Sequence, residues 1–266
     1  MDTSLWPLVE RLDTTDLAAT NVIPWSSPVP SFGDISSALV ATLGLNPSNR
    51  EFVDETGNEL DGPFRRFHTL KSLSLNRWSE ATSSHLRLIA DSCRGYFRKN
   101  PYDLWFKKLD NVISGTGSSY YSTSNVACHL DLIPYATACK WTDLKQRQRS
   151  ALLRIAADTL GLLLRESPVR LLILNGNSVV ANLQELADVT FEKQPMPSWN
   201  LPRVNISHVC GFSYRGCVRR IAGIRLHHEL TVVGFNHNIQ SSFGVTRTVM
   251  DSIRRWIANV SEDLGL

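Results

Sequence analysis

Four short runs of apolar residues, each bounded by turn-forming residues, are the clearest pattern along the chain. They are Ala38–Leu45, Asn125–Pro134, Arg170–Asn175 and Glu229–Phe235. Apolar character without alternation is typical of strands that are buried on both faces of a parallel sheet. We therefore expect these four runs to form the central strands of the fold.

Amphipathic helical patterns lie between and after these runs. Apolar residues recur at helical spacing in Ser79–Phe97, from Thr142 to about Glu166, in Asn177–Asp188, and from about Thr246 onwards. Strands that alternate with helices predict right-handed crossovers, which place helices on both faces of a parallel sheet. The fold class expected from the pattern is therefore α/β.

Two segments depart from this alternation. Residues 1–32 are rich in Pro, Ser and Trp, and we expect them to wrap the surface as an N-terminal extension. Residues 190–223 have little helical period and many turn residues, so we expect an insertion or hairpin there. With no internal repeat in sight, residues 1–266 are expected to form a single domain.

Composition adds few constraints. The chain is 42% hydrophobic and 20% charged, with a net charge of +3, as in an ordinary globular protein that tolerates an anionic partner. Its five cysteines form an odd set without a CxxC pair, so we expect reduced thiols and no metal. They are Cys93, Cys128, Cys139, Cys210 and Cys217.

Neither a secretory signal nor a membrane helix is expected. The N-terminus carries acidic residues and no basic region before an apolar stretch. The most apolar stretch, Leu152–Leu164, is interrupted by Arg154 and Asp158 and is shorter than a membrane span. We expect a soluble intracellular protein without a membrane partner.

Polar residues follow three of the four expected strands. The first ends in Gly44–Ser48, the second carries His129 and Asp131, and the fourth is followed by Asn236–Gly244. Each has an ordinary explanation as a turn, a hydrogen-bonded core pair or a structural histidine. Because the carboxyl ends of parallel strands meet at one edge, where such sheets bind ligands, we expect a single polar site.

The order of these segments resembles the uracil-DNA glycosylase superfamily. Gly44–Pro47 is similar to its first motif, Asp131–Pro134 to the segment that reads the flipped base, and His237–Gln240 lies where the family has His-Pro-Ser-Pro. The resemblance extends from about Phe32 to Trp256. It implies a three-layer α/β/α sandwich with a central four-stranded parallel sheet, and hydrolysis of an N-glycosidic bond in DNA without a metal or cofactor.

The resemblance also implies a role for each residue of the site. Asn46 would position the attacking water, and His237 would donate a hydrogen bond to the departing base as the second catalytic residue. Asp131 or His129 would read the base. The other residues expected to bind the base are Gly44, Pro47, Ser48 and Phe67, the last as a stacking aromatic with an ordinary core position as its alternative. The DNA wedge and backbone contacts are expected from Ile239, Phe243, Gln240, Ser241, Arg65 and Arg66.

Asp131 departs from the family, which has Asn at the base-reading position. An ionised carboxylate only accepts hydrogen bonds, so it suits the amino group of cytosine and repels O4 of uracil. A protonated carboxyl could also donate to N3. Branches of the superfamily remove hypermodified bases from viral DNA in bacterial antiphage defence. We therefore expect a modified cytosine, such as glucosylated hydroxymethylcytosine in phage DNA, as the substrate of a bacterial cytoplasmic enzyme.

The motifs contain no lysine, so we expect a monofunctional enzyme that leaves an abasic site, with DNA as its partner and a monomeric state. Two alternatives stay open. One is a repair glycosylase for uracil or a damaged base, and the other is a non-catalytic reader of modified DNA. A nucleoside or ester hydrolase is disfavoured because the chain has neither a GxSxG elbow nor a P-loop.

Overall fold

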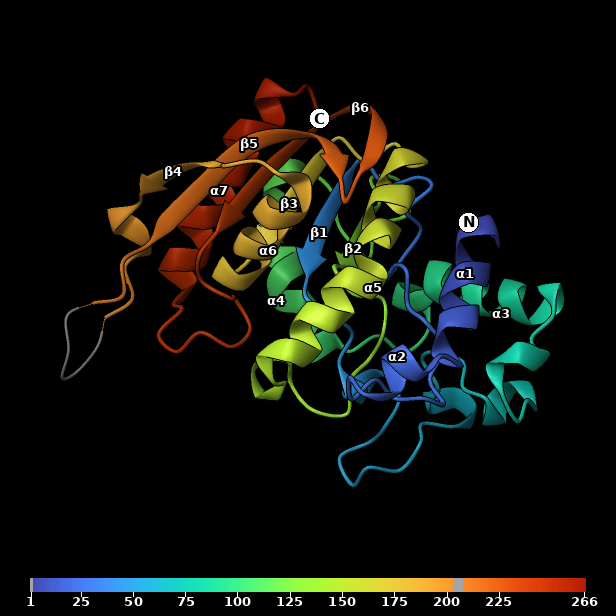
Figure 1. Cartoon of the computed structure of the whole chain (residues 1–266). Helices are drawn as coiled ribbons and strands as arrows, with labels where there is room; N and C mark the ends of the chain where they lie inside the picture. Colours follow the sequence, from blue (N-terminus) through green and yellow to red (C-terminus); the bar gives the residue numbers. More distant parts are fainter. Residues whose placement is uncertain (1, 203–207) are drawn as a thin grey trace.

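In the computed structural model, a six-stranded, mostly parallel sheet forms the centre of the protein (Figure 1), with the strand order β2-β1-β3-β6-β5-β4. The parallel strands are β1 (Val40–Gly44), β2 (Ala127–Asp131), β3 (Leu171–Asn175) and β6 (Ile224–Phe235). They coincide with the four apolar runs, which confirms the α/β class and the central strands.

Two further strands correct the expectation of a four-stranded sheet. β4 (Glu192–Pro195) and β5 (Phe212–Ile221) pair antiparallel, and β5 extends the sheet antiparallel to β6. Exposed positions recur along β5 between its buried ones, so β5 lacks the continuous apolar run by which the central strands were recognised. These strands arise from the expected insertion, part of which lies outside the described residues, 2–202 and 208–266.

Helices pack on both faces of the sheet, and alternate residues of the same strands face two separate apolar cores. On one face lie α3 (Ser83–Arg94), α5 (Gln146–Arg165) and α6 (Asn177–Ala187). On the other lie α4 (Asp103–Ile113) and α7 (Arg247–Asp263). The strands therefore end between two helical layers.

The N-terminal segment contributes to the core rather than only covering the surface. It forms α1 (Asp2–Leu12) and α2 (Thr15–Ala18), and Leu5, Leu8 and Leu17 are buried in the larger core. Figure 1 places α1 beside α3, with which it is in contact. The apolar face of α1 thus extends the helical layer that contains α3.

Helix boundaries differ most from the expected ones in two places: α3 covers Ser83–Arg94 of the expected Ser79–Phe97, and the long helix begins after Thr142. The last helix begins as expected, because the Thr246 hydroxyl accepts from the Val249 amide and caps α7. The long helix begins at Gln146, since Trp141–Asp143 forms a separate 3-10 turn, η7.

No helix in the described part of the chain is long and apolar enough to span a membrane. The other 3-10 helices are η1 (Asn49–Glu51), η2 (Gly62–Phe64), η3 (Lys71–Leu73), η4 (Trp78–Glu80), η5 (Tyr96–Arg98), η6 (Ser114–Thr116) and η8 (Pro197–Trp199).

Candidate functional site

A cavity of about 670 Å³ lies at the carboxyl ends of the four parallel strands. Its wall contains Gly44–Asn49 at and after the end of β1 and Asp131 at the end of β2. It also contains Asn175–Val179, from the end of β3 into the start of α6, and several residues of the loop after β6. This is the edge at which open α/β sheets bind ligands. The cavity therefore lies where the sequence predicted a site.

Asn46 lines the cavity with its amide held in a fixed orientation. Its Nδ2 donates to Oγ1 of Thr137 and to the carbonyl of Pro47, both at 3.0 Å. The Thr137 hydroxyl donates to the carbonyl of Cys139 at 2.7 Å, so its oxygen acts as an acceptor toward Asn46. No hydrogen bond from another described residue reaches Oδ1 of Asn46, which leaves this oxygen available to a water or ligand.

Gly44 allows two polar side chains of β2 to approach the end of β1. It pairs with Asp131 in the sheet register. A Cβ atom at Gly44 would lie 2.4 Å from Oδ1 of Asp131 and 3.0 Å from Nε2 of His129. A larger residue would displace both groups, so glycine is required by close packing at this position. The structure brings Gly44, His129 and Asp131 together on the wall that also holds Asn46 and Pro47.

A chain of buried hydroxyl and imidazole groups ends at Asp131. Tyr120 Oη lies 2.5 Å from Thr42 Oγ1, Thr42 Oγ1 lies 2.7 Å from His129 Nδ1, and His129 Nε2 lies 3.4 Å from Asp131 Oδ1. If Tyr120 donates to Thr42 and Thr42 to Nδ1, the N–H of His129 faces Asp131. In this arrangement the imidazole presents a donor, and not an acceptor, to the carboxyl group of Asp131.

The aromatic wall of the cavity comes mainly from α4 and the residue before it, and not from Phe67. Tyr102, Trp105 and Phe106 line the cavity, and the Trp105 ring packs edge-on against His129 at 5.0 Å between centroids. Phe67 is 1% exposed, stacks on Tyr96 at 5.1 Å and does not line the cavity. Phe67 thus takes the core position that was its alternative. No helix was expected at Asp103–Ile113, although the helical spacing of its apolar residues is the sequence signal that could have predicted this wall.

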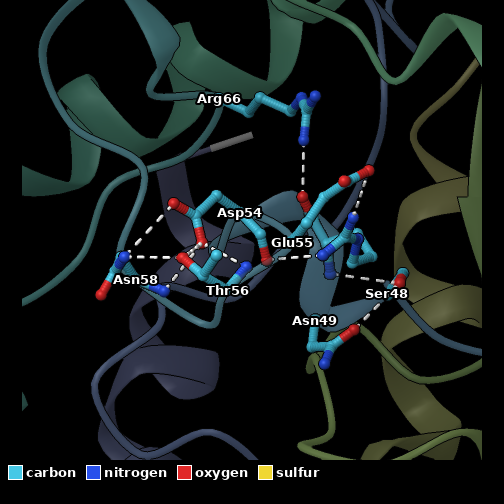
Figure 2. Close-up of polar contacts among 8 residues, drawn as sticks. Ser48, Asn49, Asp54, Glu55, Thr56, Asn58 and Arg66 are labelled. Carbon is cyan, nitrogen blue, oxygen red and sulfur yellow. Dashed lines mark hydrogen bonds and ion pairs between the residues drawn. The ribbon is translucent and has the colours of Figure 1, made fainter.

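The loop after Pro47 is closed by its own hydrogen bonds (Figure 2). Ser48, which lines the cavity, accepts from the amide of Arg50 and caps η1. Oδ1 of Asp54 accepts from the amides of Thr56 and Asn58 at 2.8 and 2.9 Å, and the Arg50 guanidinium donates to the Asp54 carbonyl at 2.5 Å. These bonds give the wall beside the cavity a defined shape.

Glu51, in η1, is a cavity residue that the sequence analysis missed. It is 3% exposed and accepts a hydrogen bond from the Tyr96 hydroxyl at 2.8 Å. Burial raises the pKa of its carboxyl to about 7, although Arg66 and Tyr96 oppose the shift; nearby Asp131 raises the pKa further. A glutamate in a three-residue turn shows no periodicity that would predict its burial.

Arg65 and Arg66, expected to contact DNA, interact within the protein and do not line the cavity. The Arg66 Nε donates to the carbonyl of Asn100 at 2.7 Å, and its guanidinium donates to the carbonyl of Arg50 at 2.5 Å (Figure 2). Arg65 lies 4.0 Å from the carboxylate of Asp61. Among the described residues that line the cavity, Lys140 is the only lysine or arginine.

His237 does not reach the cavity. It is 2% exposed, and its Nε2 lies 2.8 Å from the carbonyl of Trp199. Asn236 and Asn238, on either side of it, do line the cavity. Asn236 and His237 lie in a bend after β6, where no strand periodicity fixes which side chain faces the cavity. The expected catalytic histidine is therefore replaced on the wall by the asparagines beside it.

The rest of this loop is held by side-chain amides. Asn175 donates from Nδ2 to Gln240 at 2.7 Å, and Gln240 donates to the carbonyl of Trp105 at 3.3 Å. Gln240 and Ser241 line the cavity, whereas Ile239 is 3% exposed and lacks the exposure that a wedge requires. Phe243 is 76% exposed, as a wedge requires.

Within residues 2–202 and 208–266, no cluster of three or more His, Cys, Asp or Glu side chains could hold a metal ion. Comparisons of the chain with protein-family models and with curated proteins found no match. The resemblance to uracil-DNA glycosylases therefore rests on the short sequence motifs alone.

Proposed function

We propose that the protein is a DNA glycosylase that flips a base out of DNA and hydrolyses its N-glycosidic bond, leaving an abasic site. One observation carries the proposal. Asn46 and Asp131, which lie in separate segments that resemble family motifs, share a wall of one cavity with the aromatic ring of Trp105. A cavity of about 670 Å³ is large enough for a nucleobase with a substituent.

The polar groups of the cavity suit the steps of this reaction. Oδ1 of Asn46 accepts from a water and directs it to C1′ of the flipped nucleotide. Asp131 accepts from an amino group of the base. Asn238 supplies the donor for the departing base in place of His237: its Oδ1 accepts from the amides of Gln240 and Ser241, which leaves Nδ2 without a described partner.

The substrate that fits best is a hypermodified cytosine, such as glucosylated hydroxymethylcytosine in phage DNA. The carboxylate of Asp131 matches an exocyclic amino group, and the cavity volume leaves room for a bulky substituent. The parallel strands between two helical layers suit the three-layer α/β/α sandwich that the resemblance implies. We propose action as a monomer in the bacterial cytoplasm.

The burial of His237 favours a second candidate, a reader that binds a flipped modified base without cleaving it. Turning the imidazole toward Trp199 removes a donor for the departing base. Asp131, Trp105 and the exposed Phe243 would still serve recognition and flipping. Base release distinguishes this reader from the glycosylase.

The test uses duplex and single-stranded oligonucleotides that carry one uracil, cytosine, hydroxymethylcytosine or glucosylated hydroxymethylcytosine. After incubation, alkali converts each abasic site to a strand break. Breaks at a modified cytosine that disappear with Asn46→Ala support the glycosylase. Breaks at uracil alone support a repair enzyme. Tight binding to modified DNA without breaks supports the reader, and neither binding nor breaks refutes all three.

A further inference from the structure

Two carboxyl groups line the same cavity and differ in their surroundings. Oδ1 of Asp131 lies 3.4 Å from Nε2 of His129, whose Nδ1 is hydrogen-bonded to Thr42. Glu51 lies in η1 with its Oε2 bonded to the Tyr96 hydroxyl. Two buried carboxylates in one cavity oppose each other's ionisation, so the less well neutralised one holds a proton more tightly.

Glu51 is the less well neutralised of the two. Its nearest cation, Arg66, lies 3.9 Å from Oε2, beyond hydrogen-bond distance, and already donates to the carbonyls of Asn100 and Arg50. The amide of Tyr102 donates to the Tyr96 oxygen at 2.9 Å, which leaves the Tyr96 proton for Glu51. A single neutral donor and a distant guanidinium do not compensate for full burial of a carboxylate.

The position of the proton on Glu51 follows from these contacts. Oε2 accepts from Tyr96, whereas no hydrogen bond from a described residue reaches Oε1. The protonated form therefore carries its proton on Oε1, and Glu51 lines the cavity together with Asp131, whose ionised carboxylate would be an acceptor. One donor and one acceptor, both buried, form a pattern that a ligand edge can match.

We infer that Glu51 is a specificity-determining residue: its protonated carboxyl donates to N3 of a cytosine-type base whose amino group Asp131 accepts. The inference rests on the proposed function, because it assigns the base that this cavity reads. Cytosine presents an acceptor at N3 beside the N4 amino donor, whereas uracil presents a donor at N3 beside the O4 acceptor. With uracil, the N3–H donor would face the donor of Glu51, and the O4 acceptor would face the acceptor of Asp131.

The inference predicts a particular pH dependence. The charged or titratable groups that act on Glu51 are Arg66, Tyr96 and Asp131. Since burial raises the pKa of Glu51 to about 7, the donor is present below neutral pH and is lost above it. The rate of release of a cytosine-type base should fall about 30-fold between pH 6 and pH 8.5.

The experiment compares single-turnover release of hydroxymethylcytosine by the wild type, Glu51→Gln, Glu51→Ala and Glu55→Gln across this pH range. The amide of Gln donates at every pH, so Glu51→Gln should match the wild type at pH 6 and lose its pH dependence. Glu51→Ala should be at least tenfold slower at pH 6. Glu55, in the same loop with a side chain 91% exposed, is the matched control and should follow the wild type.

Two results of these assays would overturn the inference: a wild-type pH profile in Glu51→Gln, or a wild-type rate in Glu51→Ala. A readout independent of activity is the 13C NMR titration of the Glu51 carboxyl, assigned by difference from Glu51→Gln. A titration midpoint near that of an exposed glutamate would also overturn it.

Failure of the proposed function is recognised separately. If the wild type releases no base from any DNA, the glycosylase proposal fails, and binding then decides the role of Glu51. The probe is an oligonucleotide with one 2′-fluoroarabino-cytidine, whose glycosidic bond resists hydrolysis. Affinity that falls above neutral pH in the wild type but not in Glu51→Gln supports the inference, and affinity independent of pH in the wild type refutes it.

Discussion

The cavity wall formed by β1 and β2 differs from the wall formed after β6 in what its polar groups bind. On the first wall, Oδ1 of Asn46 and the carboxylate of Asp131 face the cavity from rigid strand ends. On the second wall, Asn238 and Gln240, with Asn175 at the end of β3, bond to one another, to the backbone of the loop or to the carbonyl of Trp105.

This difference separates two kinds of polar residue in one cavity. The first wall has donors and acceptors that remain available to a ligand. On the second wall most donors and acceptors are used in hydrogen bonds that maintain the shape of the loop, and Nδ2 of Asn238 is the group without a described partner. Substitutions on the first wall should therefore affect chemistry or recognition. Substitutions on the second wall should affect the loop, with Asn238 as the exception.

The largest expected effect is that of Asn46→Ala. Loss of the oxygen that orients water should slow base release about 10³-fold, while DNA affinity changes less than about twofold. Single-turnover kinetics and fluorescence anisotropy measure the two quantities. Asn76→Ala, at an exposed position outside the cavity, is the control and should leave both unchanged. Full activity of Asn46→Ala would remove this wall from the mechanism.

The second prediction concerns the stability cost of the Glu51 carboxylate. Since the pKa of Glu51 is raised in the folded protein, the free energy of unfolding falls as pH rises from about 4.5 through about 7. Glu51→Gln removes the buried charge that lowers the free energy of unfolding at high pH, and should stabilise the protein at pH 8 by up to about 3 kcal/mol. Urea unfolding at pH 5 and pH 8 tests it, with Glu55→Gln as the exposed control. Equal stability of the wild type and Glu51→Gln at pH 8 would contradict the burial argument.

The third prediction compares two adjacent residues of the second wall. Asn238→Asp keeps the oxygen that accepts from Gln240 and Ser241 but replaces the donor, so base release should slow about 100-fold. His237→Ala should instead lower the free energy of unfolding by about 1–3 kcal/mol and leave the rate of the folded protein within a few-fold. A large loss of rate in His237→Ala with little change in Asn238→Asp would instead indicate that His237 takes part in base release. Single-turnover rates and urea unfolding measure the two effects.

The smallest effect is expected at the mouth of the cavity. Lys140 is exposed and, among the described residues that line the cavity, is the only lysine or arginine that could meet a phosphate. Lys140→Ala should weaken binding to all sequences by less than about 1 kcal/mol and lower the slope of affinity against salt by about 1. Lys71→Ala, whose lysine lies outside the cavity beside Asp61, should not change this slope. An unchanged slope in Lys140→Ala would place the DNA backbone elsewhere.

The sequence by itself determined the central strands and the placement of Asn46 and Asp131 at the same edge of the sheet. Continuous apolar runs identify strands buried on both faces, and parallel pairing then brings their carboxyl ends to one edge. Period-two alternation also places His129 and Asp131 on the same face of β2. These inferences depend only on local pattern and on the geometry of a sheet.

The tertiary structure alone decided which side chains reach the cavity from turns and loops. A loop has no repeating geometry, so the sequence could not show which of its side chains face the cavity. Asn236 and Asn238 do, whereas His237 between them faces the carbonyl of Trp199. Phe67 is in the core and Trp105 on the wall because of what packs against each ring. The burial of Glu51 likewise depends on Tyr96 and Arg66, distant residues that only folding brings to it.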